Sequence, residues 1–571
     1  MDYTSKYEQW IADEYFDQNT RDELKSIKGN DAEIKDRFYR DLEFGTGGLR
    51  GIIGAGTNRI NIYTVRKATQ GLANYIKKQN GQSMGVAIAY DSRRMSTEFA
   101  SEAALCLNAN GIKAYVFETL RPTPELSFAV RELGCIAGIV ITASHNPAEY
   151  NGYKVYWDDG AQVTAPKDVE IIAEVNAIDD YADVKSMNQQ EALEKGLFEV
   201  IGQAIDDKYM DQLKKLVVNP ISKAGNELKI VYTPLNGTGN LPVRRILKEI
   251  GFDKVYVVPE QEMPDPDFTT VGYPNPEDPK VFTLAKKLAD EVGADIILAT
   301  DPDADRLGVQ VRNQAGEFVL LTGNMSGALI AEYVFSQKAE HGTLATNSAL
   351  VKTIVTGNMA DQIAKNYNAK LIEVLTGFKY IGEQIKLFEQ TGSNEYVFGF
   401  EESYGCLVGT HSRDKDAVVA VMTLCEAAAY YKANGVTLFE QMNTLYEKYG
   451  YFKEDLSSVT LKGIEGMEKI KSIMASYREN PPKQVGSYSV LKVRDYEGDT
   501  ITDVKTGEVS STNLPKSDVL YFDLSEDAWC AVRPSGTEPK IKFYFGVKGD
   551  SLNDAEFRLK GLMSDKVFMV S

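Results

Sequence analysis

Short apolar runs that alternate with helix-like stretches constrain this 571-residue sequence more than any other feature. The runs at 85–89, 114–117 and 136–141 are separated by helix-prone sequence such as the stretch 96–110. Strands that alternate with helices predict βαβ units and a mostly parallel sheet. A glycine cluster at 44–51 precedes them and cannot form a helix interior, because each glycine there costs roughly 1 kcal/mol relative to alanine.

The alternation of apolar runs with helix-like stretches begins again twice, and the C-terminal part has a different pattern. A polar, helix-prone stretch at 177–216 ends the first cycle, and new strand candidates follow at 228–232, 255–258, 295–299, 370–374 and 396–400. After about residue 457 the sequence is rich in β-formers. We therefore predict an α/β chain of three similar α/β domains with mixed sheets and a smaller C-terminal α+β domain. The predicted domains are 1–206, 207–320, 321–452 and 453–571.

Length and charge limit the class of protein. At roughly 150 residues per domain, the chain is long enough for three or four cores. Its 43% hydrophobic and 25% charged residues exclude a disordered chain. With 63 Lys and Arg against 82 Asp and Glu, the net charge is −19. Long-range repulsion disfavours nucleic acid and anionic membranes as partners, and an anionic substrate requires a local reversal of this field.

The cysteine pattern and the N-terminus indicate a cytoplasmic protein. The 5 cysteines form no C-x-x-C pair and are expected to be reduced thiols, with a metal or redox role as the weaker alternative. Asp2, Lys6, Glu8, Asp13 and Glu14 lie where a signal peptide needs an apolar stretch. The most apolar segments, 136–143 and 417–425, fall short of the roughly 18 residues that begin to suggest a spanning helix.

Four unusual loops follow or join predicted strands, where open α/β sheets place their ligands. The first loop, T-A-S-H-N-P, follows the run 136–141 and presents Ser144 beside His145. A held serine next to a histidine suits a nucleophile or a covalently modified hydroxyl. A loop-capping serine with a solvated histidine is the structural alternative. A hydrolase triad finds little support, because the chain has 3 histidines and lacks a Gly-x-Ser-x-Gly elbow.

The second loop reads D-P-D-A-D-R from Asp301 to Arg306. Three carboxylates at alternate positions point to one side of an extended loop and repel one another unless a cation is present. Oxygen ligands in that number suit Mg²⁺, whereas an EF-hand fails because Arg306 and Arg312 replace its glycine and glutamate. A surface acidic turn is the alternative, although Arg306 is a planar donor suited to phosphate.

The third and fourth loops offer groups for a sugar and for an anion. G-F-E-E-S-Y-G places Glu401 two residues from Ser403, an acceptor and a donor-acceptor for paired sugar hydroxyls. A surface turn before a helix capped by Asp414 or Asp416 explains this isolated segment equally well. R-P-S-G-T-E-P-K, at 533–540, combines the features of a phosphate nest. Together the four loops suit a phosphorylated sugar.

These loops resemble, in order and approximate spacing, those of the α-D-phosphohexomutase superfamily, and within it the phosphoglucomutase branch. T-A-S-H-N-P followed by Y-N-G-Y-K, D-x-D-x-D-R, E-x-S and R-P-S-G-T span nearly the whole chain. The long bacterial-type phosphoglucomutase/phosphopentomutase subgroup is the most similar. The resemblance implies four domains around a central cleft, which contribute in turn a phosphoserine, a metal-binding, a sugar-binding and a phosphate-binding loop.

The resemblance also implies the activity of an isomerase that acts as an intramolecular phosphotransferase. Ser144 would carry the phosphoryl group and help to hold Mg²⁺ with Asp301, Asp303 and Asp305. Arg50, implied to be catalytic, would face the reacting phosphate. The implied substrate-binding residues are Arg306 at the reacting phosphate, Thr376, Gly377 and Lys379 of a T-G-x-K turn, Glu401 and Ser403 at the sugar hydroxyls, and Arg533, Ser535, Gly536 and Thr537 at the other phosphate.

In the implied reaction, phosphoserine at 144 donates its group to the 6-hydroxyl of α-D-glucose 1-phosphate. The resulting glucose 1,6-bisphosphate turns around, and Ser144 takes back the phosphoryl from position 1, which leaves glucose 6-phosphate. Mg²⁺ and Arg306 would stabilise charge on the transferring group. Lys415, in the R-x-K-D segment, is the expected base, since a lysine among other cations can have a lowered pKa. His145 is the alternative base, and a helix-start lysine paired with Asp416 is the structural interpretation of Lys415.

Several alternatives remain open from the sequence. Phe400 and Tyr404 depart from the pattern of phosphomannomutases and disfavour the mannose branch, whereas ribose or deoxyribose phosphate stays possible. A haloacid-dehalogenase-like phosphatase would use Asp301 as nucleophile and Asp303 as acid, but it wants Thr or Val where Asp305 stands. A non-catalytic sugar-phosphate sensor has no use for the serine. We expect a small sugar phosphate as partner, and a monomer or weak homo-oligomer.

Overall fold

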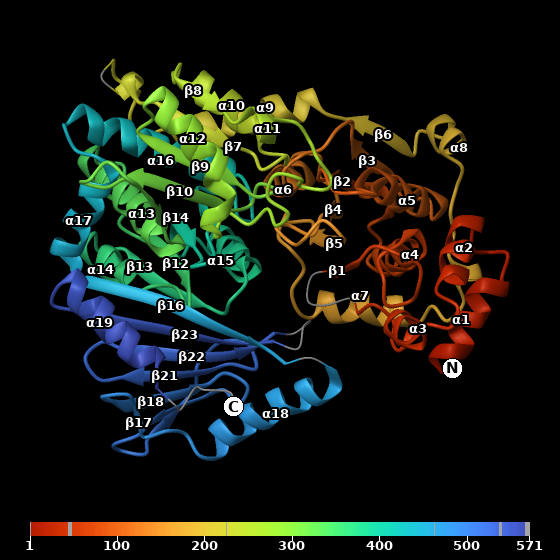
Figure 1. The fold of residues 1–571 in the computed structure, drawn as a ribbon. Helices are drawn as coiled ribbons and strands as arrows, with labels where there is room; N and C mark the ends of the chain where they lie inside the picture. Colours follow the sequence, from red (N-terminus) through yellow and green to blue (C-terminus); the bar gives the residue numbers. More distant parts are fainter. Residues whose placement is uncertain (1, 44–47, 224, 462, 536–539, 566–571) are drawn as a thin grey trace. The chain divides into compact units, whose positions relative to one another are not determined.

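Three α/β domains with mixed sheets and a β-rich C-terminal domain make up the chain (Figure 1). This computed structural model describes residues 2–43, 48–223, 225–461, 463–535 and 540–565. The backbone forms two compact units, one of residues 1–326, 378–398 and 403–435 and one of residues 327–377, 399–402 and 436–571. Within the described ranges, no helix combines the length and the apolar character needed to span a membrane.

The first sheet has six strands in the order β1-β5-β4-β2-β3-β6. The strands β2, β3, β4 and β6 are parallel, whereas β5 runs antiparallel to β4 and to β1. β2 and β4 are buried along their whole length, as strands covered by helices on both faces must be. The elements are β1 (Gly48–Ile52), α4 (Ile62–Lys78), β2 (Val86–Tyr90), α5 (Ser96–Ala109), β3 (Ala114–Phe117), α6 (Thr123–Glu132), β4 (Ala137–Ile141), β5 (Tyr150–Trp157), α7 (Lys167–Asn176), α8 (Gln189–Glu194), β6 (Phe198–Ile201) and α9 (Gln203–Lys214).

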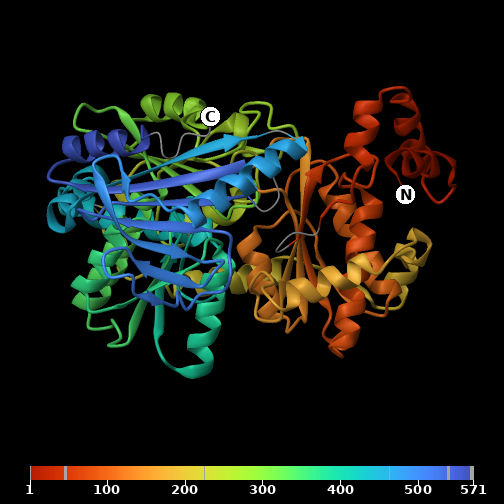
Figure 2. The ribbon, with the colours of Figure 1, turned by 90° about the horizontal axis from the view of Figure 1, so that it is seen from below.

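Three short helices precede this sheet and gather beside α4 (Figures 1 and 2). They are α1 (Tyr3–Ala12), α2 (Gln18–Ser26) and α3 (Asp31–Phe38). Trp10 stacks on Phe16 with ring centroids 4.0 Å apart, and both rings contact Tyr63 of α4. These aromatic contacts join the N-terminal helices to the first α/β domain.

The second sheet has the order β11-β10-β9-β7-β8. Parallel pairing of β7 with β8 and β9 is followed by antiparallel β10 and β11. The connection from β9 to β10 is the acidic loop. The elements are β7 (Ile230–Thr233), α10 (Asn240–Glu249), β8 (Val255–Val257), α11 (Pro259–Glu262), α12 (Thr283–Val292), β9 (Ile296–Thr300), β10 (Leu307–Arg312) and β11 (Phe318–Leu321).

The third α/β domain contributes to both compact units. In the second unit β12 and β13 pair in parallel. In the first unit, Tyr396 of β14 donates its hydroxyl to the Leu407 carbonyl of β15 over 2.9 Å. The elements are α13 (Gly323–Glu340), β12 (Ser348–Thr353), α14 (Met359–Asn366), β13 (Lys370–Val374), α15 (Phe378–Thr391), β14 (Glu395–Phe400), β15 (Cys406–Val408), α16 (Ala417–Ala433) and α17 (Leu438–Tyr449).

The C-terminal domain is a largely antiparallel sheet in the order β16-β23-β22-β21-β18-β19-β20, with β17 paired to β18. Its core includes Met474 from α18 and Leu562 from α19. The elements are β16 (Tyr451–Thr460), α18 (Gly463–Glu479), β17 (Gln484–Val485), β18 (Tyr488–Asp495), β19 (Thr500–Asp503), β20 (Val509–Ser510), β21 (Leu520–Leu524), β22 (Trp529–Pro534), β23 (Lys540–Gly549) and α19 (Leu552–Met563).

The predicted strands 114–117 and 370–374 coincide with β3 and β13. The interpretation of 177–216 as purely helix-prone is wrong, because β6 lies within it. Among the described strands, β6 pairs with β3 at the sheet edge. Glu199 interrupts its apolar residues, so no continuous apolar run marks it in the sequence.

Candidate active site

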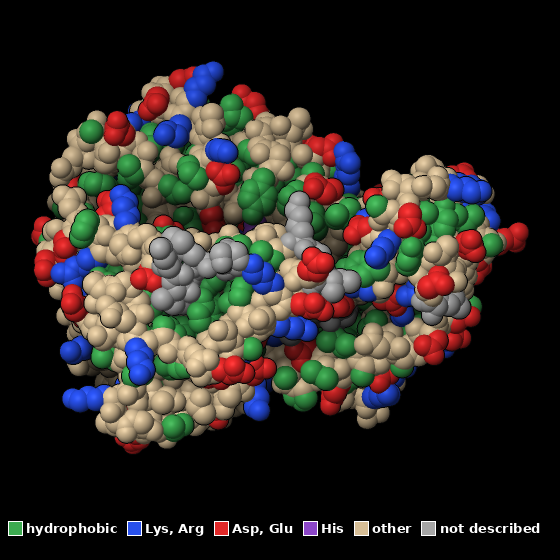
Figure 3. All heavy atoms as spheres, turned by 60° about the horizontal axis from the view of Figure 1, so that its bottom comes forward, with side chains coloured by type: hydrophobic (Ala, Val, Ile, Leu, Met, Phe, Trp, Pro, Cys, Tyr) green, Lys and Arg blue, Asp and Glu red, His purple; other side chains and the backbone are tan. Residues whose placement is uncertain are grey.

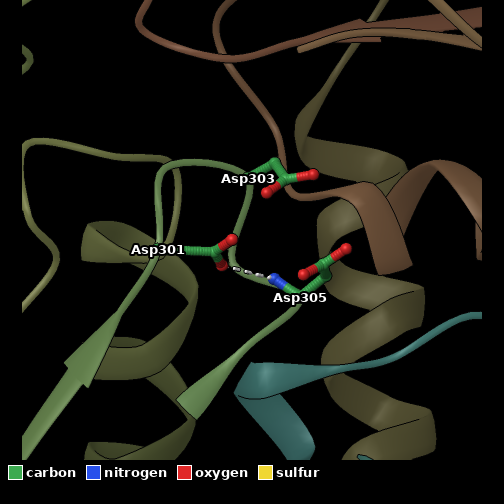
Figure 4. Close-up of side chains that lie close together, drawn as sticks. All are labelled: Asp301, Asp303 and Asp305. Atoms are coloured by element: carbon green, nitrogen blue, oxygen red, sulfur yellow. Dashed lines mark hydrogen bonds between the residues drawn. The ribbon is translucent and has the colours of Figure 1, made fainter. Parts of the chain in front are cut away.

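Three aspartates gather in the loop between β9 and β10. β9 is buried to its last residue, and Asp301, Asp303 and Asp305 that follow are each at most 2% exposed. One carboxylate oxygen of each lies within 4.8 Å of those of the other two (Figure 4). The N–H groups of Asp305 and Arg306 donate to Asp301 Oδ1 over 3.1 Å and keep the loop turned inward. The predicted gathering of the three carboxylates is therefore observed.

The charge on this cluster is unevenly distributed. Burial, together with the charges of Asp303 and Asp305, raises the pKa of Asp301 well above its usual value. Burial would also raise the pKa of Asp303. Lys154 Nζ lies 2.8 Å from Asp303 Oδ2, and its charge and hydrogen bond outweigh burial, so the pKa of Asp303 is lowered. Lys154 also lies 3.5 Å from Asp305 Oδ2.

The acidic cluster suits a divalent cation. Asp303 Oδ1 and Asp305 Oδ1 are buried and make no hydrogen bond with the described part of the chain. Three inward carboxylates supply the hard oxygen ligands that Mg²⁺, Ca²⁺ or Mn²⁺ takes, and a cation relieves their repulsion. The donor set therefore fits a metal ion held by Asp301, Asp303 and Asp305.

Ser144 meets this cluster from the loop after β4. Its Oγ donates to Asp301 Oδ2 over 2.7 Å and lies 3.1 Å from His145 Nδ1, although Ser144 and Asp301 are 157 positions apart. Its backbone has φ of 51°, in the left-handed region that few residues other than glycine adopt. The Ser144 N–H donates to Thr142 Oγ1 over 2.8 Å, which helps to hold this turn.

A buried arginine clamps the Ser144 loop. Arg93 is 3% exposed, and its Nε lies 3.3 Å from Asp91 Oδ2. Its guanidinium also donates to four backbone carbonyls of the loop, those of Ser144, Asn146, Pro147 and Tyr150. One rigid fork thus fixes the carbonyl of the left-handed residue and the backbone that follows it.

Lys415 reaches the acidic loop from the segment before α16. Its Nζ lies 3.2 Å from Asp305 Oδ2 and 3.1 Å from Asp414 Oδ1. Asp416 has a different task, because its Oδ1 accepts the N–H groups at the start of α16 and its Oδ2 accepts the Tyr209 hydroxyl. Asp416 is thus the cap of the helix, whereas Lys415 points to the aspartate cluster.

Two arginines assigned to the reacting phosphate flank the same loops. Arg306 donates to Glu277 Oε1 over 2.8 Å and to the Ser403 carbonyl over 3.1 Å. Arg50 of β1 donates to Asn146 Oδ1 over 3.4 Å, next to the Ser144 turn. Arg306 therefore links the acidic loop to Ser403 of the E-x-S loop within the first unit.

The cations change the electrostatics around His145. Burial, followed by the charges of Arg306 and Arg50, lowers the pKa of His145 well below its usual value. On the face shown in Figure 3, acidic and basic side chains are interspersed. The overall excess of 82 acidic over 63 basic residues therefore does not keep arginines away from the Ser144 loop, where the charges of Arg306 and Arg50 act on His145.

The T-G-x-K turn is divided between the two units. In the second unit, the Gly377 N–H donates to Glu401 Oε1 over 2.9 Å, which joins the turn to the E-x-S loop. Thr376 Oγ1 is buried and has no hydrogen-bond partner in the described part of the chain. In the first unit, Lys379 is 9% exposed, and its Nζ lies 3.9 Å from Asp168 Oδ2.

The fourth loop is described only in part. Arg533 is in β22, and the Ser535 N–H donates to the Lys540 carbonyl over 2.7 Å. Gly536 and Thr537 lie outside the described residues. The structure thus locates the two ends of this loop in the second unit.

Sequence reasoning gave no role to three residues that the structure brings to the site, namely Lys154, Arg93 and Asp414. Lys154 carried a signal, because it is the one lysine in the otherwise buried strand β5. Arg93 follows the carboxyl end of β2, the same position in the sheet that singled out the other loops. Asp414 appeared only as a possible helix cap, and its contact with Lys415 has no signature in the sequence.

The geometry of the first unit suits phosphoryl transfer. A buried hydroxyl lies against a carboxylate cluster that fits a divalent cation, with lysines and arginines around it. Transfer of a phosphoryl group depends mainly on such positioning and charge stabilisation.

Three family models match the chain in series. They are described as the alpha/beta/alpha domains I, II and III of phosphoglucomutase/phosphomannomutase and match residues 41–182, 207–316 and 322–449. The phosphoglucomutase of Staphylococcus saprophyticus is 37% identical over 517 residues, which are 90% of this chain and 92% of that protein. The phosphoglucomutase of Staphylococcus aureus strain N315 is 36% identical over 536 residues, 94% of each chain.

A solved structure has the same fold. It is pp63/parafusin, a phosphoglucomutase from Paramecium, in an open form. The TM-score is 0.65 at 18% identity, with 91% of this chain and 94% of that chain covered.

Proposed function

Because this chain belongs to the phosphoglucomutase branch of the α-D-phosphohexomutase superfamily, we propose that it interconverts α-D-glucose 1-phosphate and glucose 6-phosphate through phosphoserine at 144. The observation that carries the proposal is the contact of Ser144 Oγ with Asp301 Oδ2 over 2.7 Å. It joins the serine to the acidic cluster that fits a metal ion. The enzyme is an isomerase that moves a phosphoryl group within a sugar phosphate.

Asp301, Asp303 and Asp305 would hold Mg²⁺ together with a phosphoryl oxygen on Ser144. When bound, Mg²⁺ supplies positive charge that stabilises the transferring group. The chain's own residues do the rest of the positioning. Ser144 gives up the phosphoryl group as its Oγ–P bond breaks and a bond from phosphorus to the sugar hydroxyl oxygen forms. Arg306 would bind the equatorial oxygens of that group, and Arg50 would assist it.

Lys415 would take the proton that the attacking hydroxyl loses. Asp305 and Asp414 contact its Nζ and stabilise the ammonium that results. In the second transfer the sequence of events is reversed, so the ammonium returns the proton to the departing sugar oxygen. His145 contacts Ser144 Oγ through Nδ1 and would orient the hydroxyl rather than take the proton.

We assign the remaining substrate contacts to the loops of the third and fourth domains. Glu401 and Ser403 would bind sugar hydroxyls, with Thr376, Gly377 and Lys379 beside them. Arg533, Ser535, Gly536 and Thr537 would bind the non-reacting phosphate. Glucose 1,6-bisphosphate would be the intermediate and the compound that restores phosphoserine. Pentose phosphates are the alternative substrate class.

We also propose the domain limits 1–206, 207–320, 321–452 and 453–571, a cytoplasmic location, and a monomer or weak homo-oligomer. All five cysteines are free and buried, as the reducing cytoplasm favours. A sugar phosphate is the proposed partner, and no nucleic-acid or membrane partner is proposed.

The test replaces the nucleophile and compares substrates. Ser144→Ala should abolish conversion of glucose 1-phosphate to glucose 6-phosphate, whereas Ser336→Ala, whose hydroxyl donates to the Tyr333 carbonyl within α13, should retain it. EDTA should stop the wild-type enzyme, and Mg²⁺ should restore it. Intact-mass measurement should find a phosphate on the wild type but not on Ser144→Ala.

Full activity of Ser144→Ala would overturn the phosphoserine mechanism. A kcat/KM comparison of glucose 1-phosphate, mannose 1-phosphate and ribose 1-phosphate, with Mg²⁺ present, tests the substrate. A preference for ribose 1-phosphate would replace the hexose assignment with the pentose one.

A further inference from the structure

We propose that Tyr156 and Asp414 are positioning residues that hold Lys415 at the reacting centre, an inference that rests on the proposed role of Lys415 in phosphoryl transfer. The Tyr156 hydroxyl donates to Asp414 Oδ2 over 2.7 Å. The other oxygen, Asp414 Oδ1, lies 3.1 Å from Lys415 Nζ and accepts the Lys415 N–H over 2.8 Å. Asp414 thus connects the tyrosine to both ends of the lysine.

Burial gives these contacts their strength. Tyr156 is 0% exposed and Asp414 is 4% exposed, so water does not compete effectively for either group. Along β5, Lys154 and Tyr156 lie two positions apart and project from the same face of the strand. Lys154 contacts the aspartate cluster, and Tyr156 contacts the carboxylate that holds Lys415. One strand therefore supports both lysines at the cluster.

The aliphatic stem of Lys415 is held as closely as its ammonium group. A Cβ built on Gly405 would lie 2.0 Å from Lys415 Cδ, so the stem passes directly over this glycine. The ammonium group lies over the ring of Phe378, with Nζ 5.6 Å from the ring centroid. The stem therefore has little freedom to swing, and the carboxylates of Asp414 and Asp305 direct Nζ.

The segment around Lys415 is attached to the helices of the first α/β domain. The Arg413 N–H donates to Ser127 Oγ over 2.8 Å, and the Tyr209 hydroxyl donates to Asp416 Oδ2 over 2.8 Å. Arg131 of α6 donates to the carbonyl of Thr410 over 2.7 Å and to that of His411 over 3.1 Å. The first domain, which carries Ser144, therefore also fixes the segment that carries Lys415.

This arrangement has a direct consequence for the reaction. A group that exchanges a proton in the transition state must keep its distance from the reacting oxygen within a few tenths of an ångström. The Tyr156 hydroxyl and the Asp414 carboxylate would keep Lys415 in that position while substrate enters and leaves. Their loss should lower kcat and leave KM nearly unchanged, because neither group touches the substrate.

The experiment compares two buried tyrosines of the same strand in the full-length enzyme with Mg²⁺ and glucose 1-phosphate. Tyr156→Phe removes only the hydroxyl bound to Asp414, and Tyr153→Phe removes a hydroxyl that lies 3.1 Å from Thr69 Oγ1. We expect kcat to fall roughly tenfold to a hundredfold in Tyr156→Phe, with KM within about twofold, and to change little in Tyr153→Phe. In a Lys415→Met background, Tyr156→Phe should lower kcat almost no further.

Asp414→Asn is the second variant, for use if Tyr156→Phe does not fold, and it should also lower kcat at nearly constant KM. Equal kcat values for Tyr156→Phe and Tyr153→Phe would overturn the inference. It would also be overturned if Tyr156→Phe lowered kcat as much in the Lys415→Met background as in the wild type. A wild-type enzyme without mutase activity would instead overturn the proposed function.

Discussion

Arg93→Met tests whether the Ser144 turn depends on a single buried guanidinium. The substitution removes the donors to four loop carbonyls and leaves Asp91 Oδ2 without its cation. Asp91 Oδ1 keeps the Arg93 N–H at 2.9 Å and the Ser96 hydroxyl at 2.8 Å. Breaking a buried ion pair typically costs about 3–5 kcal/mol, and the surviving bonds place the expected loss of unfolding free energy near 3 kcal/mol.

The catalytic effect should exceed what the loss of stability explains. Without the clamp, Ser144 has little reason to keep its φ of 51°, and its Oγ should leave Asp301. We expect kcat to fall about a hundredfold or more, and phosphate incorporation from glucose 1,6-bisphosphate to slow in parallel. The assays are coupled production of glucose 6-phosphate, intact-mass measurement of the phosphoenzyme, and unfolding in urea.

Arg121→Met is the matched control. Arg121 is also buried and forms a two-bond pair with Asp206, at 2.8 and 2.9 Å, but it donates to Asp206 rather than to the Ser144 loop. The Arg121→Met variant should lose about as much unfolding free energy as Arg93→Met and keep kcat within about threefold of the wild-type value. The double variant Arg93→Met/Asp91→Asn should recover part of the stability but none of the rate. Equal kcat values for Arg93→Met and Arg121→Met would refute the reasoning.

Two further predictions follow from local geometry and charge. Gly405→Ala should lower kcat at least tenfold, because the added Cβ would displace the Lys415 stem. Gly561→Ala should leave kcat unchanged, because no heavy atom lies within 4 Å of the Cβ that it adds. An unchanged kcat in both variants would contradict the packing argument. Burial, followed by the charge of Glu401, raises the pKa of Glu402 to about 7. A raised pKa in the folded state means that this group stabilises the fold at low pH and loses that contribution as the pH rises through 7. From pH 5 to pH 8, the unfolding free energy of Glu402→Gln should therefore rise by about 1–3 kcal/mol relative to that of the wild type. Thermal unfolding measures this difference, and a difference that does not change with pH would contradict the prediction.

The sequence predicted the parts of the site that follow the carboxyl ends of buried strands. The runs before Ser144 and Asp301 are short, apolar and bounded by polar loops, so both the strands and the loops could be found from periodicity. The edge strand β6 could not be found in this way, because Glu199 interrupts its apolar residues. The resemblance to phosphohexomutases supplied the order of the loops and the residue roles, which remain proposals.

Contacts between distant segments could not be read from periodicity. Arg93 and the Ser144 loop are about fifty positions apart, and Tyr156 is 258 positions from Asp414. Tyr156 is a buried aromatic in a buried strand, which is what any core residue of that strand looks like. Its hydroxyl is informative only when the segment before α16 is folded against it, so this pair had no sequence signal.

The net charge of −19 and an anionic substrate are compatible because distance decides which charges matter. At physiological ionic strength, charges farther away than about 8 Å are largely screened, so most of the acidic surface contributes little at Ser144. Groups inside the fold are screened far less. Arg93 donates to the Ser144 carbonyl, and the charge of Arg306 is among those that lower the pKa of nearby His145. A phosphate that enters this interior therefore meets the local cations together with the aspartate cluster, whose charge a bound metal ion would offset. A long polyanion that stays on the surface meets the whole acidic excess.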